Sequence, residues 1–139
     1  MDATFFGVFA GVLIIGGLLI VVITLTRKGS TQLDVDKYRS KWLTIENQLK
    51  RDEESSYHLC ILNADKLLDQ ALRERGVRGE TMGERMKAVR STWSNANAVW
   101  TAHKLRNQVA HEPDVRIGYD DTRRALAAFK QALKDVGAI

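Results

Sequence analysis

An uncharged apolar run near the N-terminus constrains this chain more than any other feature. Phe5 to Thr26 comprises 22 consecutive residues without a charged side chain, and about 20 apolar residues suffice for a helix to cross a bilayer. We therefore predict a single transmembrane helix within an anchor segment, residues 1–28. A cleaved signal peptide is the alternative. It fits less well because Asp2 replaces the usual basic residues, the run is too long, and no small-residue cleavage site follows.

Basic residues follow the apolar run, and none precedes it. Arg27 and Lys28 come directly after it, and Lys37, Arg39 and Lys41 lie a little further on. Positive charge next to a membrane span marks its cytoplasmic side. We therefore expect a single-pass protein of the cell membrane, with its N-terminus outside and its C-terminal domain in the cytoplasm.

Two glycines lie four residues apart within the apolar run. Gly7 and Gly11 have the spacing that lets two membrane helices approach closely, so they are candidates for transmembrane dimerisation. Glycine is also common in membrane helices that face only lipid, and this is the alternative.

The rest of the chain has room for one domain. With 139 residues in total and 45% hydrophobic content, about a hundred residues remain to form a single core. We expect a linker at 29–33 and one domain at 34–139. The chain has a single proline, Pro113, and no useful strand alternation, so the domain should be all-α, a bundle of four to five helices. The lone Cys60 excludes an intrachain disulfide and fits a reducing compartment.

Apolar spacing predicts five helical segments in this domain. They span 34–54, 55–75, a shorter segment after the glycine-containing loop 76–83, 95–112 and 120–136. Ser55 or Ser56 should cap the second segment, and Pro113 should stop the fourth.

Segment 95–112 should present two opposite faces. At roughly 100° per residue, its core stripe consists of Ala98, Ala102, Leu105 and Val109. The opposite side should carry Trp100, His103, Asn107 and His111. Arg106 should lie on the flank between the two faces.

Arg106, Asn107 and His111 are the candidate catalytic residues. Asn107 and His111 lie one helical turn apart, so the amide can orient the imidazole while the Arg106 guanidinium reaches in from the side. This is a compact set for acid–base work and anion binding. The structural alternatives are that His111 favours the negative end of the helix dipole, or that all three residues form hydrogen bonds at a bundle or dimer interface.

This arginine-to-histidine spacing on a late helix resembles the HEPN superfamily (higher eukaryotes and prokaryotes nucleotide-binding). The resemblance covers residues 34 to 136 by helical layout, and Arg106, Asn107 and His111 by motif. Some uncharacterised single-pass bacterial membrane proteins carry segments similar to His103 to Glu112. For those proteins the resemblance implies architecture but not activity.

HEPN ribonucleases place two such motifs face to face across a homodimer. The resemblance therefore implies metal-independent RNA cleavage, in which a ribose 2′-OH attacks the adjacent phosphate. His111 would be the general base or acid, Asn107 would fix its ring, and Arg106 would bind the phosphate.

Further basic residues are candidates for contacts with RNA phosphates, namely Arg78, Arg85 and Lys104. A solvated surface of mixed charge explains them equally well. We expect no metal ion, because His103 and His111 would lie about 12 Å apart along a helix, and no other cofactor.

The main alternative is a non-enzymatic, membrane-tethered helical module that dimerises or docks a cytoplasmic protein. A net charge of +4 is modest for an RNA-binding protein, and it could equally reflect contact with anionic lipid headgroups. An interaction module would tolerate His111→Gln, whereas proton transfer by His111 would not. A third interpretation, a small subunit of a membrane complex, predicts an exposed apolar face.

Overall fold

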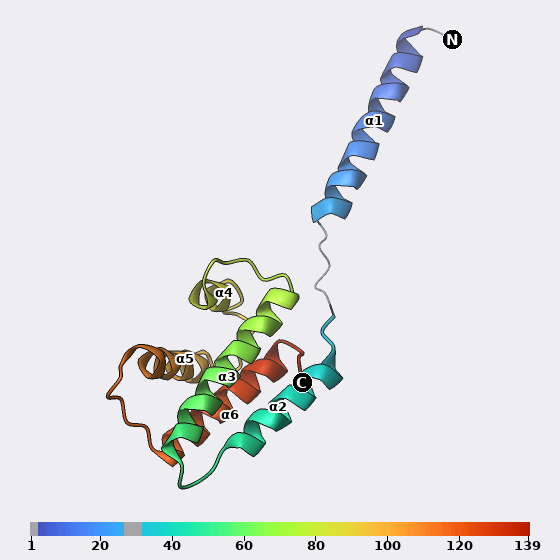
Figure 1. Cartoon of the computed structure of the whole chain (residues 1–139). Coiled ribbons are helices and arrows are strands. Elements are labelled where there is room, and N and C mark those ends of the chain that lie inside the picture. The colour runs from blue at the N-terminus through green and yellow to red at the C-terminus, as the bar shows by residue number, and fades with distance from the viewer. Residues whose placement is uncertain (1–2, 27–31) are drawn as a thin grey trace. The chain divides into compact units, whose positions relative to one another are not determined.

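The computed structural model describes residues 3–26 and 32–139. Within these ranges the chain forms six helices and no strand (Figure 1), so the all-α prediction is confirmed. The helices belong to two compact units that divide between Thr31 and Gln32. Arg27, Lys28 and most of the expected linker, residues 29–33, lie outside the described residues.

The first unit contains one long apolar helix, α1, which spans Ala3–Thr26. Its stretch Ala3–Ile23 has a mean hydropathy of 2.9, and none of it is buried by protein. Large apolar side chains such as Phe5, Val12 and Ile14 are exposed. Among the described helices, α1 alone is long and apolar enough to cross a membrane. Gly7 and Gly11 have open space around them.

The second unit begins with α2, which spans Val35–Gln48. The Asp34 side chain caps it by accepting a hydrogen bond from the Lys37 backbone N–H at 3.1 Å. Tyr38, Trp42 and Ile45 form its buried stripe. The predicted extension of this helix to residue 54 is wrong, because α2 ends at Gln48.

Ser56 explains why α2 ends early. Its Oγ accepts a hydrogen bond from the Lys50 N–H at 3.0 Å and donates to the Glu53 carbonyl at 2.7 Å. These bonds hold residues 50–53 in a turn that reverses the chain. The prediction that Ser55 or Ser56 is the N-cap is also wrong, because Glu53 occupies that position. Ser56 instead stabilises the turn through its hydrogen bonds.

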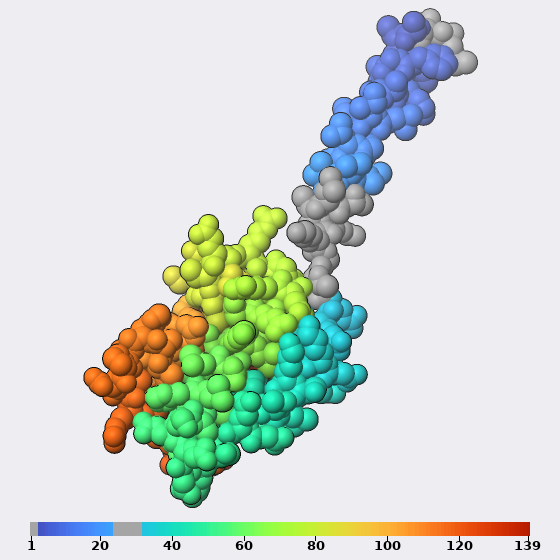
Figure 2. All heavy atoms as spheres, in the orientation of Figure 1, coloured from blue at the N-terminus to red at the C-terminus, as the bar shows by residue number. Residues whose placement is uncertain are grey.

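The central helix is α3, which spans Glu54–Glu74 and contacts α2, α4, α5 and α6. Fully buried residues line much of its length: Cys60, Ile61, Ala64, Leu68, Ala71 and Leu72. Figure 1 shows α2, α3 and α6 as long neighbouring helices, and Figure 2 shows α2 packed closely along α3. Because α3 touches every other helix of its unit, a side chain on its surface can meet residues from several elements.

Three more helices complete the second unit. They are α4 at Met82–Ala88, α5 at Ala96–His111 and α6 at Tyr119–Asp135. Thr81 and Asn95 cap α4 and α5 by accepting hydrogen bonds from Glu84 N–H and Ala98 N–H. The bounds of α5 and α6 match the predicted segments to within one residue, and α4 is the shorter helix expected near the glycine-containing loop.

The core face of α5 differs from the predicted stripe. Val99, Ala102 and His103 are its buried residues, whereas Ala98, Leu105 and Val109 are only partly buried. The prediction that His103 lies on the face of α5 opposite the core is wrong, because His103 is buried. The reason is that α5 packs against both α3 and α6, so two of its faces are covered.

Candidate functional site

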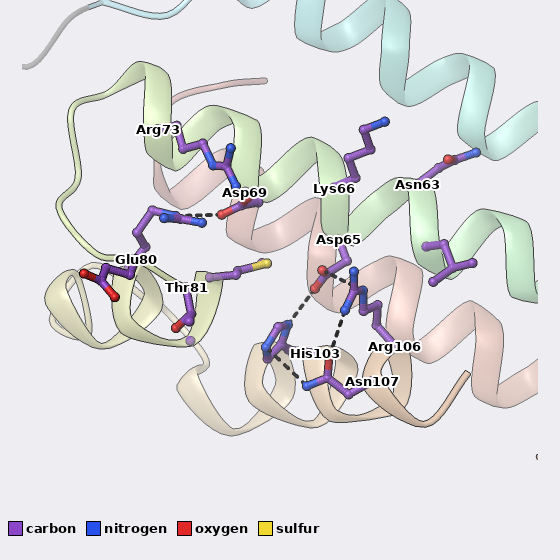
Figure 3. Close-up of a pocket in the computed structure, with 14 residues that line it drawn as sticks. Asn63, Asp65, Lys66, Asp69, Arg73, Glu80, Thr81, His103, Arg106 and Asn107 are labelled. Atoms are coloured by element: carbon purple, nitrogen blue, oxygen red, sulfur yellow. Dashed lines mark hydrogen bonds and ion pairs between the residues drawn. The ribbon is translucent and has the colours of Figure 1, made fainter. Parts of the chain in front are cut away.

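A cleft of about 680 Å³ opens between α3, α4 and α5. Its walls are mainly polar (Figure 3). The lining residues are Leu62, Asn63, Asp65, Lys66, Asp69 and Arg73 of α3, Glu80 to Gly83 and Arg85 at α4, and His103, Arg106 and Asn107 of α5.

A buried carboxylate, Asp65, joins α3 to α5 in this cleft. The side chain of Asp65 is 4% exposed, and its Oδ1 lies 2.8 Å from His103 Nδ1. Its other oxygen, Oδ2, lies 3.3 Å from Arg106 Nε. Burying a carboxylate is costly unless charged or hydrogen-bonding partners compensate it, and here both partners come from one face of α5.

Asn107 contacts both Arg106 and His103. Its Oδ1 accepts a hydrogen bond from Arg106 Nη1 at 3.0 Å, and its Nδ2 lies 3.5 Å from His103 Nε2. Residues three and four positions apart are neighbours on a helix surface, which is why His103 meets Asn107 and why both His103 and Arg106 reach Asp65. We refer to Asp65, His103, Arg106 and Asn107 as the Asp65 cluster; Figure 3 shows its four side chains pointing toward one another.

A second carboxylate, Asp69, lies one turn further along α3 and holds α4. It pairs with Arg85 Nε at 2.7 Å and with Arg73 Nη2 at 2.9 Å. Arg85 is 5% exposed, and its Nη1 donates to the Gly79 carbonyl at 2.6 Å. The far wall of the cleft is therefore tied to the same helix as the Asp65 cluster.

The structure places two of the three predicted catalytic residues in the cleft and the third outside it. Arg106 and Asn107 line the cleft, but His111 does not. His111 is the last residue of α5 and is exposed. The Asn107 amide, which the sequence suggested would orient His111, contacts His103 instead. Arg106 and Asn107 thus come together with a different histidine from the one that the motif indicated.

The predicted phosphate contacts are also dispersed. Arg85 is engaged with Asp69 and Gly79. Arg78 is exposed and lines an adjoining hollow of about 920 Å³ beside the α3–α4 loop, which shares Arg73, Glu80 and Arg85 with the cleft. Lys104 is exposed and lies outside the cleft lining. Arg85 is the one member of this group that lines the cleft.

Sequence reasoning missed Asp65 and Asp69. They lie one helical turn apart on α3, and Asp65 falls next to the buried Ala64. A carboxylate at a buried position of a helix requires a partner from another element. That signal is visible in the sequence, but it does not identify the partner.

Four cationic side chains and three carboxylates line the cleft, so its formal charge is close to balanced. Within the part of the chain that the structure describes, no cluster of three or more His, Cys, Asp or Glu side chains could hold a metal ion. An imidazole fixed by a carboxylate can accept a proton, and a neighbouring guanidinium can bind a phosphate or carboxylate. The cleft combines both capacities.

Comparison of the chain with protein-family models, curated proteins and solved structures finds no match. The geometry of the cleft is therefore the main support for a functional proposal.

Proposed function

We propose that this protein is a membrane-anchored domain that binds single-stranded RNA in the cleft between α3, α4 and α5 and cleaves it without a metal ion. One observation carries the proposal. Arg106 and Asn107, two members of the sequence motif, lie together on the cleft wall beside a histidine held by a carboxylate.

The anchor in this proposal is α1. Its length and apolar surface on every side suit a bilayer better than water. Arg27 and Lys28, which follow it in the sequence, favour a cytoplasmic location for the second unit. RNA is present in the cytoplasm, so a domain on that side of the membrane would have access to the proposed substrate.

The second unit is assigned to the HEPN class as part of the same proposal. Its helical architecture and the spacing from Arg106 to His111 support this assignment. A homodimer follows from the resemblance, with α5 of each copy near the interface. Confinement of the anchors to one membrane would favour that pairing by raising the effective concentration of the domains.

In the reaction, Arg106 binds the scissile phosphate. Its side chain is 35% exposed although Nε contacts Asp65 and Nη1 donates to Asn107, so the guanidinium can still meet an anion in the cleft. The ribose 2′-oxygen loses its proton to a histidine of α5 and attacks phosphorus. The bond between phosphorus and the 5′-oxygen breaks, and the products carry a 2′,3′-cyclic phosphate and a 5′-hydroxyl. Positive charge at Arg106 stabilises the negative charge that develops on the phosphate oxygens.

The test uses the full chain in lipid nanodiscs with fluorescent single-stranded RNA and excess EDTA. Arg106→Lys keeps a positive charge near Asp65 but loses the planar fork that binds phosphate bidentately. We expect this variant to bind RNA roughly tenfold more weakly, which corresponds to about 1.4 kcal/mol, and to cleave it more slowly. Arg124→Lys is the matched control, because Arg124 lies on the exposed surface of α6 and outside the cleft.

A folded parent protein that neither binds nor cleaves several RNAs would refute the proposal. The second candidate function, a non-enzymatic docking or dimerisation module, would then be preferred. One observation favours that candidate. Asp65 and Asp69 link α5 and α4 to α3 through ion pairs, and a purely structural role in holding these helices together would account for such pairs. In that case Arg106→Lys would alter stability but no RNA property.

A further inference from the structure

Within the proposed RNA cleavage, on which this inference rests, we infer that His103 is the catalytic base and that Asp65 and Asn107 position it. The sequence motif indicates His111 for this role. The contacts of the Asp65 cluster lead to a different assignment.

The first step of the argument concerns Nδ1 of His103. This atom lies 2.8 Å from Asp65 Oδ1, and the Asp65 side chain is 4% exposed. An ionised carboxylate only accepts hydrogen bonds, so Nδ1 must carry a hydrogen. Asp65 therefore holds the ring in one orientation and leaves Nε2 as the atom that exchanges a proton.

The second step concerns Nε2 and follows from the amide of Asn107. Arg106 Nη1 can only donate, and it lies 3.0 Å from the Asn107 oxygen. This contact turns the Asn107 NH₂ group toward His103 Nε2, at 3.5 Å. An NH₂ group faces a ring nitrogen favourably only when that nitrogen has a free lone pair. The hydrogen-bonding chain from Arg106 through Asn107 thus orients the amide toward Nε2, in an arrangement that suits the tautomer with its lone pair on Nε2, the atom that a base uses.

The third step concerns access. His103 lines the cleft, and its ring meets the Trp100 ring edge-on with centroids 6.1 Å apart, which restricts its rotation. The contact from Asn107 to Nε2, at 3.5 Å, is too long to be a strong hydrogen bond. A ribose hydroxyl can therefore replace it, while Arg106 lies beside His103 to receive the adjacent phosphate.

The proton balance is complete without another cofactor. His103 Nε2 takes the 2′-OH proton as the 2′-oxygen bonds to phosphorus. The departing 5′-oxygen takes a proton from water, and the imidazolium returns its proton to the hydroxide that results. Asp65 stabilises the transient imidazolium and does not itself become protonated.

The decisive variant is His103→Asn. The asparagine NH₂ group occupies about the position of imidazole Nδ1, so the hydrogen bond to Asp65 can persist while the base is lost. We expect RNA affinity close to that of the parent and a cleavage rate lower by roughly 10²- to 10⁴-fold, the usual contribution of general acid–base catalysis. His111→Gln tests the histidine that the sequence motif indicates. Gln108→Asn, at an exposed position of the same helix outside the cleft lining, is the control that should retain the parent rate. Experiments use the full chain in nanodiscs with EDTA.

A spectroscopic measurement tests the positioning roles independently of turnover. Imidazole ¹⁵N shifts of the parent, recorded where the ring is neutral, should show the His103 tautomer with Nδ1 protonated and Nε2 bare. In Asp65→Asn, the new amide can donate a hydrogen bond to Nδ1. The ratio of the two His103 tautomers should then shift toward the one with its hydrogen on Nε2, and the cleavage rate should fall as this shift occurs. A purely structural Asp65 would give no such correlated change.

The outcomes separate this inference from the proposed function. Cleavage that survives in His103→Asn but disappears in His111→Gln would overturn the assignment of the base and leave RNA cleavage standing. A neutral His103 ring in the parent with its hydrogen on Nε2 would also overturn it. A folded parent that binds RNA without cleaving it would overturn both the cleavage and its base, and a parent that does not bind RNA would remove the proposed function itself.

Discussion

Asp65 is the most buried charged residue of the cleft lining, at 3% exposed. It is buried on the central helix and pairs with both His103 and Arg106 of α5. A buried ion pair contributes little net stability when intact, but loss of one partner leaves an uncompensated buried group. The cost of altering Asp65 should therefore exceed that of altering an exposed acid by a wide margin.

We predict that Asp65→Ala lowers the free energy of unfolding of the second unit by about 3 kcal/mol. Asp114→Ala, at an exposed position in the loop before α6, should change it by less than about 0.5 kcal/mol. Urea unfolding followed by tryptophan fluorescence reports this unit alone, because Trp42, Trp93 and Trp100 are the three tryptophans of the chain. Equal effects of the two substitutions would contradict a structural role for Asp65.

Glu74 makes the second unit sensitive to acid. The neighbouring Tyr38 hydroxyl and Lys37 ammonium lower the pKa of Glu74 from 4.5 to about 2. A carboxylate with a lowered pKa in the folded state contributes stability above its unfolded pKa and loses it as the pH falls. That loss should occur between pH 4.5 and about 2.

We predict that Glu74→Gln lowers the unfolding temperature at pH 7 and that the difference from the parent shrinks as the pH falls below 4.5. Thermal unfolding followed by tryptophan fluorescence from pH 7 downward measures the unfolding temperature of both proteins. Subtracting one from the other removes the effect of groups that titrate in both. A difference that stays constant with pH would rule out a contribution from the ionised Glu74.

At the scale of elements, the α3–α4 loop determines where α4 lies. Gly79 has φ of +155°, and a Cβ there would lie 2.9 Å from the Arg85 backbone nitrogen. The loop closes tightly over α4, whose Arg85 bonds back to the Gly79 carbonyl and to Asp69. The position of one wall of the cleft therefore depends on a glycine.

We predict that Gly79→Ala destabilises the second unit by about 1–3 kcal/mol, because it combines an unfavourable backbone conformation with a close contact. Gly118→Ala is the control, since Gly118 has an ordinary φ of −79° and space for a methyl group. The same urea experiment compares them. If Gly79→Ala proves as stable as Gly118→Ala, the loop does not constrain α4 in the way we describe.

At the scale of the whole molecule, the chain combines two units with opposite solvent preferences. α1 exposes apolar side chains and none of its apolar stretch is buried by protein, whereas the second unit buries its own core around α3. A helix that is apolar on all sides requires a nonpolar environment. This difference between the two units supports the proposed membrane attachment.

We predict that the parent protein stays in the membrane fraction after an alkaline carbonate wash. The double substitution Ile14→Lys and Leu18→Lys should release it, because each charge near the middle of a span costs about 2.5–3.5 kcal/mol. Ile14→Leu with Leu18→Ile is the control and should remain bound. Retention of the double-lysine protein would show that α1 is not the anchor.

Features that depend on nearby residues were predictable from the sequence. The apolar run of α1, the helical content, and the proximity of Arg106 to Asn107 follow from hydropathy and from the spacing of neighbours on a helix. Helix ends were less predictable, because the end of α2 depends on Ser56, which bonds back to Lys50 from within α3.

The pairing of the motif with a histidine was decided only by tertiary structure. Asp65 and His103 are 38 positions apart, and Asp69 and Arg85 are 16 apart. Periodicity within one helix shows which residues share a face, but not which helix will cover that face. The sequence by itself determined an apolar helix followed by helical segments and the local order of Arg106 and Asn107. The packing of α5 against both α3 and α6 buried His103 beside Asp65 and left His111 exposed.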